Sequence, residues 1–378
     1  SVHDRICQRA GLIMSDEQTR LGELRVKIDS LDKKIMELIS ARAKCAQEVA
    51  HVKMAANPGQ DVFFYRPERE AQVLRRIKEA NPGPLAGEEM ARLFREIMSA
   101  CLALEKPMHI AFLGPIGTFT QAAALKHFGH SVVSVPLPAI DAVFREVESG
   151  AAHYGVVPVE NSTEGMINHT LDMFMSSPLK ICGEVQLRIH HHLLVSPEFR
   201  DQEITCIYSH QQSFAQCRQW LDTHRYGIER VTVSSNAEAA RRAAKEPGAA
   251  AIAGDMAAEL YGLEKLANSI EDRPDNTTRF LIIGREEVPA SGHDKSSILV
   301  SMRNKPGALY QLLEPFHSHG ISLTRIETRP SPSGTWAYVF YIDFEGHMDD
   351  EQAHKVLAEV DEEAVELKRL GSYPIGVL

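Results

Sequence analysis

The feature that most constrains the fold of this chain is a long heptad repeat near its N-terminus. Apolar residues there recur in alternating steps of four and three, which predicts one helix over residues 17–56. A helix of about 40 residues would be about 60 Å long. A seam of that length needs another helix to cover it, and we expect a second subunit to supply it. The seam residues are Leu24, Ile28, Leu31, Ile35, Leu38, Cys45, Val49 and Val52.

One position of this seam is polar. Arg42 stands between Leu38 and Cys45, and burying its guanidinium without a partner would be costly. Lys53 lies about three helical turns later and therefore on nearly the same face. The two cations indicate either a snorkelling pair at the edge of the seam or a cationic pocket for a dicarboxylate. Two shorter helices are predicted next, from Pro67 to about residue 80 and from about residue 87 to 105.

Past residue 107 the pattern changes to short apolar runs separated by helical segments. Such alternation predicts an α/β domain with substantially parallel sheets. Ligands of such domains bind at the carboxyl ends of strands and in crevices between lobes. The expected strands are HIAFLG, SVVSV, YGVVPVE, HHLLVS, ITCIYS, RVTVSS, AAIAG and RFLIIG.

Five polar clusters stand at the ends of these strands. Each cluster alone has an ordinary explanation as a turn or a helix cap. Their repetition predicts a polar site built from several strand ends, and the cluster ahead of RFLIIG is especially rich in hydrogen-bond donors. The clusters are GPIGTFT, PVENSTEG, SHQQSFAQC, the SN pair at 235–236, and NTTR at 276–279.

A third unit follows a polar linker at 286–294. Its order of strand-like and helical segments over 295–378 predicts the βαββαβ arrangement of ferredoxin-like domains. Residues 1–13 precede Met14 and carry little pattern, so we expect them to be an extension outside the fold.

Bulk properties exclude several classes of function. The net charge of −10 and the pI of about 5.9 argue against nucleic acid or an anionic membrane as the main partner. Six scattered cysteines without metal-ligand spacing indicate free thiols in a reducing cytoplasm. The run HHH at 190–192 cannot converge on one metal ion if it lies on a strand, because neighbouring side chains alternate between faces. We therefore expect neither a metal nor an organic cofactor.

The helical segment resembles the AroQ-type chorismate mutases. The resemblance rests on LRVKIDSLDKKIMELISARAKCAQEVAHVK, YRPERE and FREIMSACLALE, and implies an all-α domain over 14–106. It further implies that Arg25 of the opposite protomer, Arg42 and Lys53 bind the substrate carboxylates and ether oxygen. Glu70 would hold the ring hydroxyl.

Three residues depart from the common pattern of that family. Arg66 stands where an Asp is frequent, Cys101 replaces a Ser, and Glu105 replaces a Gln; all three remain expected substrate contacts. The last change has a chemical consequence. A Gln amide donates to the ether oxygen at any pH, whereas Glu105 donates only when it is protonated. We therefore expect Glu105 to be a catalytic residue with a raised pKa.

Residues 107–285 resemble the prephenate dehydratases. GPxGTF, ENS, SHxQ, SNAEAA and TRF occur here in that family's order. The resemblance implies two α/β lobes like those of periplasmic binding proteins, with the substrate in the cleft between them and Thr278 as the catalytic residue. The other residues implied to line the substrate are Thr118, Asn161, Ser162, Ser209, Gln216, Arg279 and Phe280.

The third unit resembles ACT regulatory domains through NKPGALYQLL and ETRP. The resemblance implies that L-phenylalanine binds there as an allosteric inhibitor, although a plain ferredoxin-like dimerisation module has the same strand order. The implied contacts are Asn304, Gly307, Ala308, Leu309, Glu327, Arg329 and Pro330.

Together the three resemblances imply a cytoplasmic, bifunctional enzyme that rearranges chorismate to prephenate and converts prephenate to phenylpyruvate. A homodimer or homotetramer is expected. Two alternatives stay open: a dehydratase whose helical segment only dimerises, and a non-catalytic amino-acid sensor.

Overall fold

The computed structural model describes residues 2–59, 62–331 and 338–378. The chain divides into two compact units. One comprises Ser1–Phe64 with Ala100–Lys106, and the other comprises Tyr65–Ser99 with Pro107–Leu378. The predicted helical segment 14–106 therefore contributes residues to both units.

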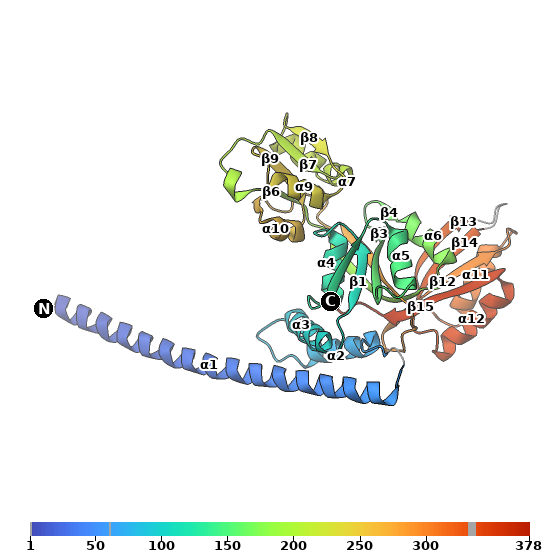
Figure 1. The fold of residues 1–378 in the computed structure, drawn as a ribbon, viewed down its shortest axis with the longest axis horizontal. Helices are drawn as coiled ribbons and strands as arrows, with labels where there is room; N and C mark the ends of the chain where they lie inside the picture. Colours follow the sequence, from blue (N-terminus) through green and yellow to red (C-terminus); the bar gives the residue numbers. More distant parts are fainter. Residues whose placement is uncertain (1, 60–61, 332–337) are drawn as a thin grey trace. The chain divides into compact units, whose positions relative to one another are not determined.

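The first unit contains α1, Val2–Ala56, which is one continuous helix (Figure 1). It begins earlier than the predicted start at residue 17 and ends at the predicted Asn-Pro-Gly stop. There the Asn57 amide donates to the Lys53 carbonyl at 3.0 Å, and Gly59 has a φ of 77°. Glycine adopts this left-handed conformation without strain, so the chain can leave the helix at this point.

The predicted seam of α1 lies on the helix surface. Leu24, Ile28 and Ile35 are 49%, 54% and 54% exposed. Among the described residues of this unit, no helix covers this apolar face. An uncovered apolar stripe of this kind is the usual mark of a helix that associates with a partner.

The two shorter helices have the predicted bounds. α2 spans Pro67–Ala80 and begins with proline, whose fixed φ suits the first helical turn. It buries Ala71 and Leu74 within the second unit. α3 spans Gly87–Glu105, and its residues up to Ser99 belong to the second unit.

The first lobe of the α/β region contains a mixed sheet in the order β2-β1-β3-β11-β5, with β4 beside β3. β1 is parallel to β2 and β3, whereas β11 is antiparallel to both β3 and β5. The strand β5 was not predicted. The elements are β1 His109–Leu113, α4 Phe119–Phe128, β2 Val133–Leu137, α5 Ile140–Glu148, β3 Tyr154–Asn161, β4 Gly165–Met166, α6 Asn168–Ser176, β5 Lys180–Arg188 and β11 Thr277–Gly284.

The second lobe lies in the chain between β5 and β11, so the backbone passes between the lobes twice. Its sheet has the order β10-β6-β9-β7-β8 and is also mixed, with β7 parallel to β8 and β9. The prediction of substantially parallel sheets therefore holds for only part of each lobe. The elements are β6 His192–Val195, η1 Pro197–Phe199, β7 Cys206–Ser209, α7 Gln211–Gln216, α8 Arg218–His224, β8 Glu229–Thr232, α9 Asn236–Ala243, β9 Ala249–Ala253, α10 Asp255–Tyr261 and β10 Glu264–Ala267.

The C-terminal domain has the predicted βαββαβ order and an antiparallel sheet, β13-β14-β12-β15. Both helices lie over one face of the sheet (Figure 1), where Phe316, Phe344 and Leu357 form the core. Tyr341 and Tyr373 of the other face pack with the core of the first lobe. The elements are β12 Asp294–Met302, α11 Ala308–Ser318, β13 Leu323–Pro330, β14 Tyr338–Glu345, α12 Glu351–Glu363 and β15 Glu366–Pro374.

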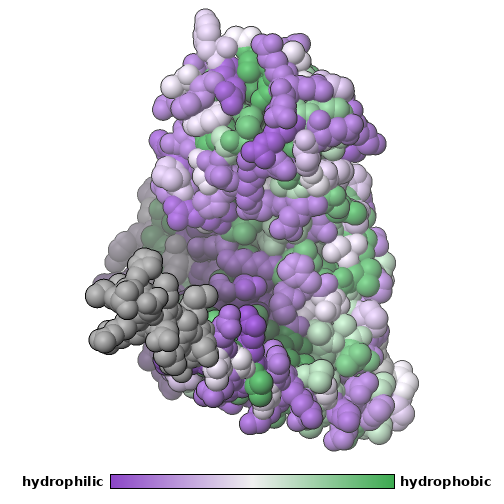
Figure 2. Space-filling view, turned by 90° about the vertical axis from the view of Figure 1, so that its left-hand side faces the viewer, coloured by the Kyte–Doolittle hydropathy of each residue, from purple (hydrophilic) through white to green (hydrophobic). Residues whose placement is uncertain are grey.

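On the face that Figure 2 shows, hydrophilic residues predominate and apolar residues stand in small groups. Within the described ranges, each helix is too short or too polar to cross a bilayer.

Candidate active site

A cavity of about 350 Å³ lies between the two lobes of the α/β region. Its wall includes residues from the carboxyl ends of β1 and β3 and from the beginning of β11. All five of the predicted polar clusters contribute to it directly. The expected residues in its lining are Thr118, Asn161, Gln216, Thr278 and Phe280.

The hydroxyl of Thr278 is oriented by its neighbours. Asn161 Oδ1 accepts from the Thr163 backbone N–H at 3.0 Å, and this bond fixes the orientation of the Asn161 amide. Asn161 Nδ2 must then donate to Thr278 Oγ1, at 2.9 Å, and to Asn276 Oδ1, at 3.0 Å. No hydrogen bond among the described residues uses the Thr278 hydroxyl as a donor. Its proton is therefore available to a ligand in the cavity.

His191 belongs to the same network, although the sequence pointed to it only as a poor metal ligand. Gln216 Oε1 accepts from Asn276 Nδ2 at 3.2 Å, while Gln216 Nε2 donates to Glu164 at 3.1 Å. His191 Nε2 must therefore donate to Gln216 Oε1, at 2.8 Å. Burial lowers the pKa of His191 and favours the neutral ring, so Nδ1 is a hydrogen-bond acceptor. This atom is buried without a protein partner in the described structure.

Two helix N-termini border the cavity. Thr118 caps α4 and accepts from the Gln121 N–H, and Ser235 caps α9 and accepts from the Glu238 N–H at 3.0 Å. Both caps line the cavity, and no described lining residue is a lysine or an arginine. Free N–H groups and the helix dipole favour anions at such positions. The site can therefore attract carboxylates without a guanidinium.

Three residues expected to line the substrate lie elsewhere. Ser162 accepts from the Thr277 N–H at 2.9 Å, and Ser209 is fully buried behind the wall against Asn236. Arg279 follows Thr278 on β11, and successive strand residues point to opposite faces. Its guanidinium therefore points away from the cavity.

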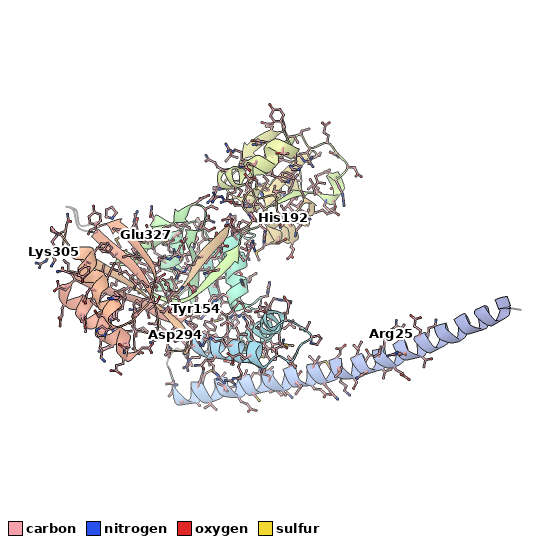
Figure 3. All side chains as sticks on the ribbon, turned by 180° about the vertical axis from the view of Figure 1, so that it is seen from behind. Arg25, Tyr154, His192, Asp294, Lys305 and Glu327 are labelled. Carbon is pink, nitrogen blue, oxygen red and sulfur yellow. The ribbon has the colours of Figure 1, made fainter. Side chains whose placement is uncertain are left out.

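The first unit carries five of the residues implied by the mutase resemblance. Arg25 projects from α1 (Figure 3), Arg42 and Lys53 are half-buried on the same helix, and Cys101 is buried on α3. Burial raises the pKa of Glu105, an effect that nearby Lys53 opposes. The direction agrees with the expectation for a residue that must donate a proton.

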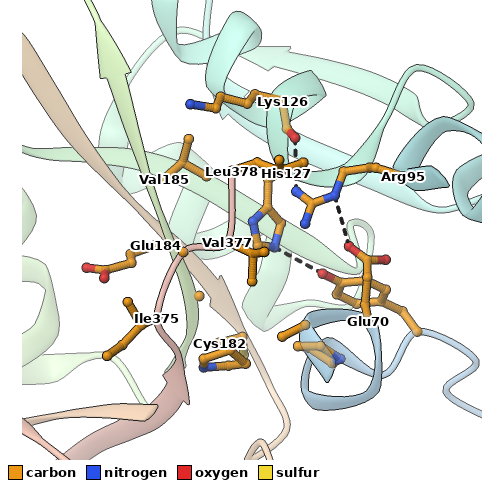
Figure 4. Close-up of a pocket in the computed structure, with 16 residues that line it drawn as sticks. Glu70, Arg95, Lys126, His127, Cys182, Glu184, Val185, Ile375, Val377 and Leu378 are labelled. Carbon is orange, nitrogen blue, oxygen red and sulfur yellow. Dashed lines mark hydrogen bonds and ion pairs between the residues drawn. The ribbon is translucent and has the colours of Figure 1, made fainter. Parts of the chain in front are cut away.

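The second unit carries the remaining two, Arg66 and Glu70. Glu70 is paired with Arg95 Nε at 3.3 Å, and Arg95 Nη1 donates to the Lys126 carbonyl at 3.0 Å (Figure 4). Burial raises the pKa of Glu70, and Arg95 opposes that shift. Arg66 is more exposed and pairs with Glu68 at 2.5 Å.

The residues implied to bind phenylalanine lie at two places in the C-terminal domain. Gly307 has a φ of 81° at the start of α11, and Asn304, Ala308 and Leu309 surround it on the exposed loop and first turn. The others, Glu327, Arg329 and Pro330, lie on β13, where Figure 3 labels Glu327. Arg329 also makes a forked ion pair with Asp172 of α6, at 2.7 and 2.8 Å.

Comparison with known proteins agrees with the three-part organisation. Residues 24–106 match the family description of chorismate mutase type II, residues 110–288 that of prephenate dehydratase, and residues 296–362 that of the ACT domain. The fold and the cavity thus define a dehydratase joined to a mutase and a regulatory domain.

Relatives of nearly the same length carry all three parts. The bifunctional chorismate mutase/prephenate dehydratase of Stutzerimonas stutzeri is 66% identical over 96% of this chain and all of its own, and that of Pseudomonas aeruginosa is 64% identical over the same shares. The chain belongs to this family of bifunctional enzymes, which confirms the predicted fold class and both activities. The crystal structure of an Arthrobacter aurescens prephenate dehydratase in complex with L-Phe covers 71% of this chain and 90% of its own, with 34% identity and a TM-score of 0.65.

Proposed function

We propose that the chain rearranges chorismate to prephenate with the mutase residues named above and converts prephenate to phenylpyruvate in the cavity between the lobes. The observation that carries the second assignment is the Thr278 hydroxyl, which lines the cavity with its proton uncommitted. Lining amides and helix N-termini suit a substrate with two carboxylates.

The chemistry explains why a neutral donor suffices at this position. When the ring carboxylate leaves as carbon dioxide, its bonding electrons enter the ring and expel the hydroxyl at the opposite carbon. That hydroxyl accepts a proton and leaves as water, and the ring becomes aromatic. A threonine hydroxyl is a weak acid, so Thr278 acts as an oriented donor or proton relay that stabilises the departing oxygen. No cofactor takes part.

Regulation by L-phenylalanine is the second part of the proposal. The chain has an ACT domain, and the Arthrobacter aurescens enzyme, whose structure resembles this one, was crystallised with L-Phe. The contacts that the resemblance implies lie on the exposed loop at Gly307 and on the strand β13. A cytoplasmic location is part of the same proposal, and the free thiols of the described cysteines support it.

One experiment tests the whole assignment. Chorismate is supplied to the purified chain, and prephenate and phenylpyruvate are followed with and without saturating L-phenylalanine. We expect phenylpyruvate to form from chorismate and L-phenylalanine to slow the second step. Consumption of prephenate but not chorismate would reduce the helical segment to a dimerisation arm. Binding without any phenylpyruvate would make the chain a sensor.

We also propose that two copies associate through α1, because its apolar seam is uncovered and Arg25 is expected to serve the partner's mutase site. Leu31→Glu should then dissociate the dimer and lower mutase activity at least about tenfold, since a charge at a seam position opposes helix pairing. Sedimentation velocity gives the mass. Val26→Glu, on the same helix but outside the seam, is the control. A Leu31→Glu protein that keeps the native mass would contradict association through this seam.

A further inference from the structure

A buried set of charges joins the ACT domain to the rear of the strand that carries Thr278. The Arg279 side chain is 6% exposed. Its Nε donates to Glu184 of β5 at 2.8 Å. Its Nη1 donates to Asp343 at 2.7 Å and its Nη2 to the Tyr373 hydroxyl at 3.0 Å. Asp343 lies on β14 and Tyr373 on β15, so ACT residues hold β11 from the side opposite the cavity.

An arginine of the ACT domain holds the neighbouring strand. Arg325 of β13 forms an ion pair with Glu160 of β3, and its Nε lies 3.7 Å from Asp343 Oδ2. Glu160 directly precedes Asn161, the residue whose amide donates to Thr278 Oγ1. Both strands that meet at the catalytic hydrogen bond are therefore tied to the same ACT carboxylate, one directly and one through Arg325.

The buried charged residues between the ACT domain and the first lobe are better suited to fixing the orientation of the strands than to stabilising the contact alone. Apolar residues of similar size can hold two surfaces together as well as buried ion pairs do, because ion pairs lose hydration on burial. A guanidinium bonded through several nitrogens also fixes angles. Every cation in the set faces a carboxylate: Arg279, Lys295 and Arg325 against Glu160, Glu184 and Asp343.

We propose that Arg325 is a positioning residue of the dehydratase reaction. Through Glu160 it holds the end of β3 so that Asn161 orients the Thr278 hydroxyl toward the departing oxygen. This inference rests on the proposed role of Thr278. Arg325 also shares β13 with Glu327 and Arg329. A ligand that moves this strand would therefore change the hydrogen bond between Asn161 and Thr278.

Arg325→Met tests the proposal, because it removes the charge and keeps an unbranched apolar stem. We expect the dehydratase kcat to fall about tenfold, since a small misplacement of a catalytic group has effects of this order or larger. The KM for prephenate should stay within about twofold because no substrate contact is lost. Arg325→Lys, which keeps the ion pair with Glu160, should recover most of the kcat. The unchanged KM for prephenate reports that the dehydratase cavity is folded, and unchanged chorismate mutase activity reports the same for the mutase site.

Lys368→Met is the matched control. Lys368 also links the ACT domain to the first lobe, donating to the Phe174 carbonyl at 2.7 Å and the Ser177 carbonyl at 2.6 Å, but it touches neither β3 nor β11. Equal kcat losses in Arg325→Met and Lys368→Met, or a loss confined to KM, would overturn the positioning role. Thr278→Ala, measured alongside, distinguishes a failure of the role proposed for Thr278 from a failure of the role proposed for Arg325. If Thr278→Ala is active, the assignment of Thr278 fails; if it is inactive while Arg325→Met is normal, only the role of Arg325 fails.

Discussion

Thr278→Ala is expected to lower the dehydratase kcat by about 10³-fold, in line with the loss of one oriented hydrogen-bond donor from an active site. In the variant the Asn161 N–H that donates to Thr278 Oγ1 loses its acceptor, but Asn161 Nδ2 lies 2.9 Å behind that oxygen and cannot supply a proton at the same place. Mutase activity should not change, because Thr278 lies in the α/β region. Stopped assays with chorismate and with prephenate measure the two activities separately.

Two neighbouring variants make this test specific. Thr278→Ser keeps the hydroxyl and should keep most of the activity. Thr277→Ala removes a hydroxyl that donates to the Asp275 carbonyl at 3.1 Å, and it should leave kcat close to that of the native chain. If Thr277→Ala and Thr278→Ala lost activity to the same extent, the loss would reflect the strand entrance and not the oriented donor.

The mutase rate of the native chain should fall about tenfold for each pH unit above the pKa of Glu105, because only the protonated carboxyl donates to the ether oxygen. Burial raises this pKa, so the active form persists to higher pH than an ordinary glutamic acid allows. Mutase activity is therefore expected to be high at low pH and to fall progressively as the pH rises through the raised pKa of Glu105. Over two pH units above it the loss reaches about 100-fold.

Glu105→Gln should abolish the fall in mutase rate above the pKa of Glu105, since an amide donates a hydrogen bond both below and above that pH. Glu89→Gln is the control on the same helix, because Glu89 is exposed and paired with Arg92 at 2.8 Å. It should keep the native profile. Superimposable profiles for the native chain and Glu105→Gln would show that Glu105 is not the titrating donor.

Local patterns predicted many of the elements and their order. The bounds of α2 and α3 follow from nearby proline and glycine residues and from an apolar stripe. The βαββαβ order of the last domain follows from its alternating strand-like and helical segments. The strand β5 was missed because KICGEVQLR mixes charged and apolar residues. Its sheet partner β11 and the ACT strand β15 that packs near it are both distant in the sequence.

The sequence by itself determined which residue types stand at the strand ends and which families they resemble. Only the tertiary structure decided which of them meet. β11 runs antiparallel to β3, so Thr278 at the start of one strand lies opposite Asn161 at the end of the other, 117 residues away. Strand alternation then sends Arg279 out of the cavity and toward the ACT domain. Which residues meet depends on pairing between strands that are distant in the sequence, and local spacing does not predict that pairing. For this reason Arg279 was expected in the substrate site, whereas the structure places it behind that site.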